Sequence, residues 1–302
     1  MAANGRIETF GFSTHGGKPD LTGLDADLCD IAETGATHAE LSLFAYDLIA
    51  GGRLLLDRVR RLEAICARHD LNYTVHGFLA ANFMATADLD RHIAACSAMI
   101  ELCGILGAKV MVHHAGIAPT MAEEPLKQLF RQERHCLRQM GDLAARHDIR
   151  IAVETLFVDR ADRTTADPAR LARQIREVDH PNVVGTLDFS HAYLMTSWRG
   201  LDLREAVRAF APVAGHCHVH DSFGRPKRTR TMAKAEDMAF GEGDLHLPIG
   251  WGDIPWDDLL PELAFLPETI FMFEIPPRYR SELKACAETA RRLIPAIGSR
   301  AD

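Results

Sequence analysis

Four side chains that can bind a divalent metal stand at or near the ends of short apolar segments. They are Glu154 in IAVET, Asp188 in VVGTLDFSH, His218 in GHCHVHD and Glu274 in IFMFEI. A carboxylate at the tip of an apolar strand is unfavourable unless something neutralises it, and a divalent cation does so. Barrel enzymes place their chemistry at the C-terminal ends of parallel strands. The four residues therefore predict a metal-dependent enzyme.

The elements that must position these residues alternate between short apolar segments and amphipathic stretches. Helical spacing is clearest from Leu89 to Leu106, where apolar residues recur every three or four positions. Such alternation over 302 residues is typical of an α/β fold with a single closed (β/α)8 TIM barrel. An open doubly wound sheet is the alternative, but no glycine-rich dinucleotide fingerprint follows an early strand. We expect strands at 8–13, 38–43, 71–76, 109–114, 149–154, 182–188, 214–220 and 269–275.

One connection is much longer than the others. It follows the seventh expected strand and covers about residues 221–255. Long loops in compact domains are usually functional or mobile, and this loop would lie on the catalytic face. No linker or low-complexity tract divides the chain, so we predict one TIM-barrel domain over residues 1–302.

The composition narrows the class of partners. There are 34 basic and 42 acidic residues, which give a net charge of −8. This balance argues against broad attraction to nucleic acid or membrane, although a local basic patch is compatible with it. No apolar segment of membrane-spanning length and no signal-peptide core are found. The 7 cysteines fit buried thiols in a reducing cytoplasm, with Cys217 as a packed core thiol. A homo-oligomer is also compatible with the sequence.

Strand parity gives the direction in which the four residues point. Residues two apart share a face of a strand. Glu274 therefore shares a face with Met272, and His218 shares one with His216 and His220. The last inward residue of each strand should lie at the barrel mouth. We place His220, which is further out, at the rim.

Five further residues are candidates for the same mouth. His76 ends the third expected strand, and His114 ends the fourth with inward parity, which makes it preferable to its neighbour His113. Taken alone, a histidine such as His76 or His114 at the end of a strand is more often a hydrogen-bonded polar residue than a metal ligand. Asp244 and His246, taken alone, would be ordinary polar residues of the long loop. Imidazole and carboxylate sets suit Zn, Mn, Fe or Co rather than Ca. The five candidates are His76, His114, His191, Asp244 and His246.

The chain resembles the xylose isomerase-like superfamily of TIM barrels over nearly its whole length. That superfamily holds sugar and sugar-phosphate isomerases and epimerases, some dehydratases, and the endonuclease IV DNA-repair enzymes. Its epimerase pattern is Glu, Asp, His, Glu at the ends of strands five to eight, matched by Glu154, Asp188, His218 and Glu274. The resemblance implies that Glu154 and Glu274 are catalytic and move a proton, and that His191 contacts substrate.

The endonuclease IV pattern is larger and holds three zinc ions. His76, His114, His191, Asp244 and His246 match its additional positions. This likeness implies one to three ions and further metal ligands at those five positions. The chain departs from the pattern at HHAG, where the endonucleases have FHPG, and at Leu79, where they have a DNA-contacting tyrosine. These departures weaken the expectation of DNA recognition more than that of metal binding.

A short basic segment lies in the long loop. It contains Arg225, Lys227, Arg228 and Arg230. One interpretation is a solvated face, and the other is a clamp that closes on a phosphate or carboxylate. Some epimerases of the superfamily hold substrate with an arginine shortly after the strand-seven histidine. Arg225 is the nearest match, so the resemblance implies a substrate-binding role for it.

Two enzyme classes use such a site. The function we expect is that of a divalent-metal-dependent isomerase or epimerase, or a related proton-abstracting enzyme, acting on a sugar or sugar phosphate. The alternative is a multinuclear phosphodiester hydrolase resembling endonuclease IV, which is an AP endonuclease. A binding protein with a vestigial metal site is a third hypothesis, but all the relevant carboxylates are intact. The acidic balance argues against a nucleic-acid partner without excluding one.

Overall fold

Eight parallel strands close into a barrel, and their order around the ring follows the chain. The computed structural model describes residues 7, 9–14, 18–120, 122–157 and 167–301. The ring closes because the first strand pairs with the last strand on one side and with the second on the other. The predicted TIM barrel is confirmed; residue 8, the start of the first expected strand, lies outside the described residues. The barrel strands are β1 (Phe10–Ser13), β2 (His38–Ser42), β5 (Asn72–His76), β6 (Val110–His114), β7 (Arg150–Glu154), β8 (Val183–Asp188), β9 (Ala214–Val219) and β10 (Ile270–Phe273).

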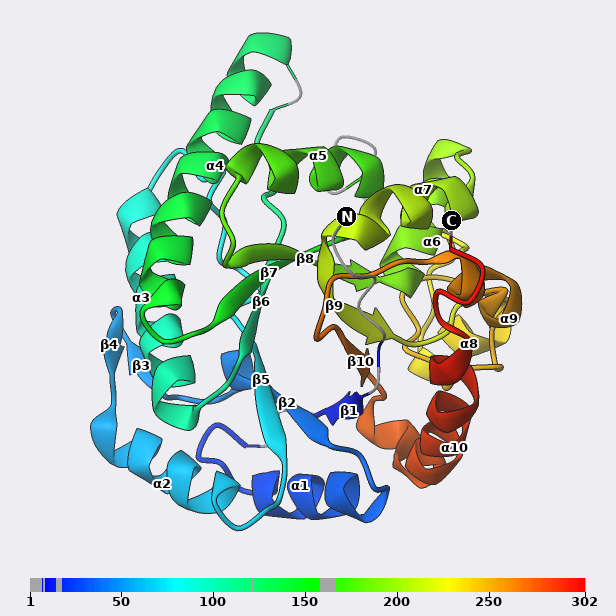
Figure 1. Cartoon of the computed structure of the whole chain (residues 1–302), viewed down its shortest axis with the longest axis horizontal. Coiled ribbons are helices and arrows are strands. Elements are labelled where there is room, and N and C mark those ends of the chain that lie inside the picture. The colour runs from blue at the N-terminus through cyan, green and yellow to red at the C-terminus, as the bar shows by residue number, and fades with distance from the viewer. Residues whose placement is uncertain (1–6, 8, 15–17, 121, 158–166, 302) are drawn as a thin grey trace.

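Helices surround the barrel and cover its outer face (Figure 1). A two-stranded antiparallel hairpin, β3 (Ile49–Ala50) and β4 (Arg53–Leu54), precedes the second helix. In the part of the chain that is described, no helix has the length and apolar content to cross a membrane. The helices are α1 (Leu24–Glu33), α2 (Leu56–Cys66), α3 (Leu89–Leu106), α4 (Glu123–Ala145), α5 (Pro168–Val178), α6 (Phe189–Arg199), α7 (Leu203–Phe210), α8 (Lys234–Phe240), α9 (Trp256–Leu259) and α10 (Leu283–Leu293). Short 3-10 turns are η1 (Leu43–Ala45), η2 (Ala211–Val213), η3 (Leu260–Glu262), η4 (Pro277–Glu282) and η5 (Ile294–Ala296).

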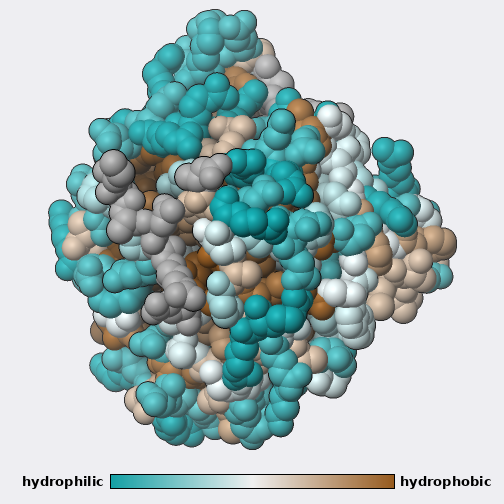
Figure 2. All heavy atoms as spheres, turned by 45° about the vertical axis from the view of Figure 1, so that its right-hand side comes forward, coloured by the Kyte–Doolittle hydropathy of each residue, from teal (hydrophilic) through white to brown (hydrophobic). Residues whose placement is uncertain are grey.

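Local sequence explains where α5 begins. The Oδ1 atom of Asp167 accepts a hydrogen bond from the backbone amide of Arg170 at 3.0 Å, which satisfies an amide that the helix itself leaves free. Pro168 follows in the first turn, where its missing amide costs nothing. Hydrophilic residues cover much of the face of the molecule shown in Figure 2, and the most hydrophobic residues show mainly in the recesses between them.

The barrel interior has an apolar layer below a polar one. Val110, Ala152, Val184, Ile270 and Met272 pack together inside the ring and belong to four of its strands. They occupy the inward positions nearer the N-terminal ends of these strands. Further along the same strands, the inward positions end in polar residues at the mouth: His114, Glu154, Asp188 and, just after β10, Glu274. Because inward-facing residues alternate along each strand, the closely packed apolar layer and the polar site at the mouth lie one above the other inside the same barrel. Cys217 has the opposite parity and is buried in the outer core, as expected for a core thiol.

The strand register brings residues that are distant in sequence to the same height. His218 on β9 is level with Asp188 on β8 and with Met272 on β10. His114 on β6 is level with Glu154 on β7. Because neighbouring strands in a sheet lie about 4.8 Å apart, side chains at one height and on one face reach each other.

The long loop is fastened to the barrel by one buried carboxylate. Asp221, just after β9, accepts hydrogen bonds from the amides of Ser222 at 3.0 Å, Gly250 at 2.8 Å and Ile254 at 3.3 Å. It also forms a backbone bridge with Leu247, with N–O distances of 2.7 and 3.1 Å. Asp221 therefore joins the beginning of the loop to its end.

We expect Asp221→Ala to loosen this loop. The lost hydrogen bonds to a charged acceptor should lower the free energy of unfolding by about 1.5–3 kcal/mol. Trypsin should then cleave faster after Lys227, Arg228 or Arg230, as followed by mass spectrometry. Asp258→Ala is the matched control, because Asp258 is an exposed aspartate on α9. Equal cleavage rates in the two variants would show that Asp221 does not fasten the loop.

Candidate metal centre

A cavity of about 390 Å³ lies at the C-terminal ends of the barrel strands. Its lining combines metal-ligand types with apolar side chains. Phe44 and Leu79, both partly exposed, belong to the apolar part, together with Phe157. The polar residues in the lining include His76, His114, Glu154, His191, Asp244, His246 and Glu274.

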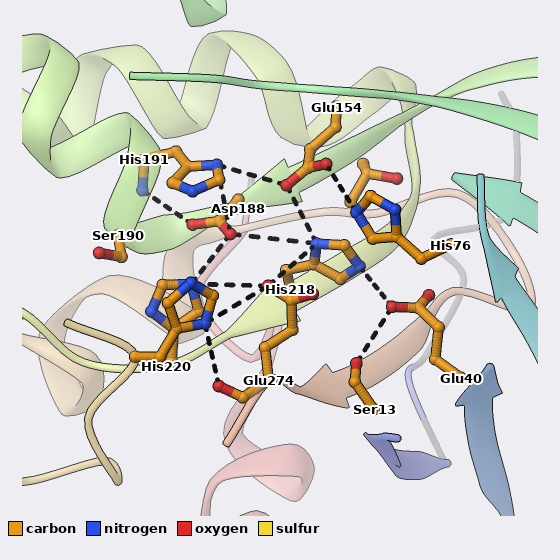
Figure 3. Close-up of polar contacts among 12 residues, drawn as sticks. Ser13, Glu40, His76, Glu154, Asp188, Ser190, His191, His218, His220 and Glu274 are labelled. Atoms are coloured by element: carbon orange, nitrogen blue, oxygen red, sulfur yellow. Dashed lines mark hydrogen bonds and ion pairs between the residues drawn. The ribbon is translucent and has the colours of Figure 1, made fainter. Parts of the chain in front are cut away.

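The first donor group consists of Glu154, Asp188, His218 and Glu274, and one donor atom from each lies within 4.8 Å of the others. The Nδ1 atom of His218 lies 3.1 Å from Glu154 Oε1, 3.6 Å from Glu274 Oε2 and 3.9 Å from Asp188 Oδ2 (Figure 3). Two ligands bound tetrahedrally at about 2.1 Å from one ion are roughly 3.4 Å apart. The spacing of these donors fits a single transition-metal ion.

A second donor group lies beside the first and shares Glu154 with it. His76 Nε2 is 3.4 Å and His114 Nε2 is 3.3 Å from Glu154 Oε2. Within the described part of the chain, this oxygen is buried and has no hydrogen-bond partner. A buried carboxylate oxygen without a partner is unfavourable, so the donor set fits a cation here too. His113 points the other way, and its ring stacks on Phe83 with centroids 4.4 Å apart.

A third donor group combines two barrel residues, His191 and His220, with two residues of the long loop, Asp244 and His246. Asp244 Oδ2 lies 2.7 Å from His246 Nε2 and 3.4 Å from His191 Nε2. The rings of His220 and His246 stack with centroids 3.9 Å apart.

The position expected for His220 was wrong. It is not at the rim: its side chain is fully buried, and its Nε2 atom lies 3.0 Å from Asp188 Oδ2. The reason is the long loop, which folds back over the strand ends and places His246 on top of the His220 ring. His220 therefore joins the third donor group, in place of a solvent-facing role.

Charges within the site balance one another. Burial opposes ionisation of Glu154, but His218, His191 and His76 together outweigh it and hold the pKa of Glu154 well below its usual value. Burial also opposes protonation of His246, yet Asp244 raises the pKa of His246 to about 9. Burial lowers the pKa of His114 to about 4, so that this imidazole is neutral at pH 7 and has a lone pair for a metal.

Hydrogen bonds fix the loops that follow His76 and His114. Asn82, six residues after His76, donates from Nδ2 to the carbonyl of Ile117 at 2.9 Å and accepts from the Ile117 amide at 3.1 Å. The buried carboxylate of Glu133 accepts from the Gly116 amide at 2.7 Å. These bonds tie the two loops to each other and to α4.

Arg225 lies away from the cavity. It is exposed, its guanidinium carbon lies 5.5 Å from the centre of the Phe223 ring, and Nη1 donates to the Phe240 carbonyl at 3.4 Å. Lys227 pairs with Asp237 at 2.8 Å. A substrate contact by Arg225 stays a prediction, and it would require the loop to change its position.

Comparison with known proteins agrees with this architecture. A family model described as "Xylose isomerase-like TIM barrel" matches residues 29–296. The chain belongs to the xylose isomerase-like TIM-barrel family. The resemblance inferred from the strand-end residues is thereby confirmed. No curated protein sequence matches the chain.

Several solved structures share the fold. A D-tagatose 3-epimerase-like protein is 19% identical with a TM-score of 0.71, covering 95% of this chain and 98% of its own. The 3-keto-D-glucoside 4-epimerase of E. coli is 17% identical with a TM-score of 0.64, covering 94% and 98%. The IolI protein, solved with a zinc atom, is 16% identical with a TM-score of 0.66, covering 97% and 99%. At these identities the likeness establishes the fold.

Sequence reasoning missed two buried residues of this xylose isomerase-like barrel. Glu40 on β2 and His216 on β9 are fully buried below the first donor group, and they hydrogen bond to each other at 2.9 Å. The sequence did contain an indication for Glu40. It is the only carboxylate in the short segment HAELS, and it shares a face of the strand with Ser42 at the strand end. His216 had been placed on the inward face without a role.

Because Glu154 belongs to two donor groups, its removal should affect more than one ion. We expect Glu154→Ala to reduce the metal content by more than His246→Ala does, since His246 belongs to the third group only. Elemental analysis after loading with Zn or Mn and gel filtration measures the ions per chain. Glu288→Ala on α10, an exposed position, is the control. Unchanged metal content in Glu154→Ala would contradict the assignment of this carboxylate.

Proposed function

We propose that this protein is a divalent-metal-dependent isomerase or epimerase that acts on a sugar or sugar phosphate. The observation that carries the proposal is the first donor group at the mouth of the barrel. Glu154 and Glu274 both belong to this group and both line the cavity. Two carboxylates beside one ion-binding position are what proton removal and return next to a carbonyl require.

Glu154, Asp188, His218 and Glu274 would hold the ion, which we propose to be Zn, Mn, Fe or Co. When bound, a divalent ion polarises a carbonyl oxygen and stabilises negative charge that develops on it. The deep burial of Asp188 and His218 suits them to holding the ion. Glu274, whose side chain is 15% exposed, is the group best placed to reach a substrate in the cavity.

The chain's own residues would move the proton. One carboxylate of the pair Glu154 and Glu274 takes the proton from carbon, and the electron pair of that C–H bond passes toward the neighbouring carbonyl. The other group, which must start this step as the protonated carboxylic acid, then gives its proton to the same carbon from its own side while the electron pair returns from the oxygen and the carbonyl is restored; proton exchange with solvent resets the pair. His191, with Nδ1 3.3 Å from Glu154 Oε1, is a polar group in reach of a substrate hydroxyl. Phe44, Leu79 and Phe157 would exclude water from the reacting carbon.

Two further observations support the proposal. The cavity volume of about 390 Å³ falls in the range typical of small-molecule sites. Proteins with the same fold include ones named as epimerases of D-allulose and of a 3-keto-D-glucoside, and one solved with zinc. A free or phosphorylated monosaccharide is therefore the substrate class to test first.

The proposal predicts exchange of a carbon-bound proton with solvent. In D2O, the metal-loaded protein should introduce deuterium next to the carbonyl of a ketose or ketose phosphate, as followed by NMR and mass spectrometry. Glu274→Gln should reduce the exchange rate by about 10²-fold or more, because the amide cannot accept the proton. Glu288→Gln should behave like the wild type. The metal content of each variant separates loss of the base from loss of the ion.

Exchange at the wild-type rate in both Glu274→Gln and Glu154→Gln would contradict the roles assigned to the two glutamates. Absence of exchange across a broad panel of sugars and sugar phosphates, with metal bound, would contradict the isomerase class itself.

The second and third donor groups favour a second candidate, a multinuclear phosphodiester hydrolase. Two or more ions near each other can activate water and stabilise a leaving oxygen. His76 and His114 on one side of Glu154, and His191, Asp244 and His246 on the other side of the mouth, provide donors for further ions. Epimerase chemistry needs only the first group.

The two candidates differ in the bond that is broken. A hydrolase should cleave a duplex that contains an abasic site, or bis(p-nitrophenyl) phosphate, with incorporation of solvent ¹⁸O into the product. Such cleavage should require His246 and Asp244, whereas deuterium exchange should tolerate His246→Ala. Enzyme-like cleavage without any exchange would replace the isomerase proposal by the hydrolase.

A further inference from the structure

One buried carboxylate, Glu40, lies below the first donor group and is not needed to complete it. It belongs to β2, and its side chain is fully buried inside the barrel. An ionised carboxylate in such a place is unfavourable unless its oxygens are hydrogen bonded. The contacts of Glu40 with four neighbouring side chains explain how it is accommodated.

Each oxygen of Glu40 faces two donors. Oε1 lies 3.1 Å from the Ser13 hydroxyl and 3.0 Å from His218 Nε2. Oε2 lies 3.1 Å from the Thr74 hydroxyl and 2.9 Å from His216 Nε2. Figure 3 shows Glu40 between Ser13 and His218. Four hydrogen bonds saturate the carboxylate, so it has no need of an ion of its own.

This arrangement determines which ring nitrogen of His218 carries the hydrogen when the imidazole is neutral. An ionised carboxylate only accepts hydrogen bonds, so the Nε2 atom of His218 must carry the hydrogen. The other ring nitrogen, Nδ1, faces Glu154, Asp188 and Glu274. In a neutral imidazole with hydrogen on Nε2, Nδ1 has the free lone pair that a metal requires.

We propose that Glu40 is a positioning residue for the metal centre, which holds His218 with hydrogen on Nε2 and its Nδ1 lone pair directed at the ion. The negative charge of Glu40 also makes the imidazole a stronger donor to a cation. His216 provides a second N–H donor on the opposite oxygen, and among the described residues its Nδ1 atom has no hydrogen-bond partner. His216 is assigned the supporting role because it contacts Glu40 and is not one of the four side chains of the first donor group.

The inference rests on the metal dependence in the proposed function and not on the reaction. Its test is accordingly the binding of Co²⁺, followed through the visible absorption band of the ion. We expect Glu40→Gln to weaken Co²⁺ binding by about 10–100-fold, the usual effect of losing a group that orients a metal ligand. The glutamine can still accept from His218, so the variant removes the charge and keeps the packing.

Thr74→Val is the matched control. It removes a hydrogen bond from the same carboxylate, but from the oxygen that His218 does not contact. We expect it to bind Co²⁺ within about threefold of the wild type. Equal affinities in Glu40→Gln and the wild type would overturn the proposal. A loss of one whole ion from the stoichiometry would also overturn it, because Glu40 would then be a ligand in its own right.

A measurement on the unmodified protein covers the case in which Glu40→Gln does not fold. In ¹⁵N-histidine protein loaded with ¹¹³Cd, His218 should show coupling of the metal to Nδ1 and a protected hydrogen on Nε2. Coupling to Nε2, or no metal binding at all, would overturn the proposal. A failure of deuterium exchange alone would contradict the isomerase class and leave these metal results standing.

Discussion

Buried negative charge at the mouth of the barrel is the constraint on which the rest of this structure depends. Glu40, Glu154 and Asp188 are almost completely inaccessible to solvent. Removing a carboxylate from water is unfavourable by several kcal/mol even after the protein relaxes. The side chains that hydrogen bond to these three carboxylates are histidines, a serine and a threonine. These donors stabilise the buried carboxylates when no cation is bound. The same cluster of negative charge and imidazole nitrogens also suits the mouth to binding a cation.

Much of this arrangement could be predicted from the sequence. Apolar segments at regular intervals with helical patterns between them identify the barrel, because each strand and helix must bury one face. Strand parity then places Glu154, Asp188 and His218 on the inner face, since the side-chain period of a strand is two. The structure brings these residues together, together with the five further candidates that sequence position suggested.

Other features depend on tertiary packing and were not predicted. Glu40 is alone on a short strand, and only the closed ring shows that it lies opposite His216 and His218. The burial of His220 results from a loop whose path no periodic pattern describes. His246 in that loop has a backbone φ of 48°, a left-handed conformation that non-glycine residues rarely adopt. Loop geometry of this kind is fixed by contacts such as those of Asp221, which sequence spacing does not encode.

The third donor group has a mixed origin: His191 and His220 come from the barrel, and Asp244 and His246 come from the loop that Asp221 fastens. A cation bound by both pairs of residues would link the loop to the barrel. By mass action, the free energy needed to open the loop would rise with the logarithm of the free metal concentration. The loop residues Asp244 and His246, which line the cavity, would then be held to the barrel more firmly as more of the protein binds metal.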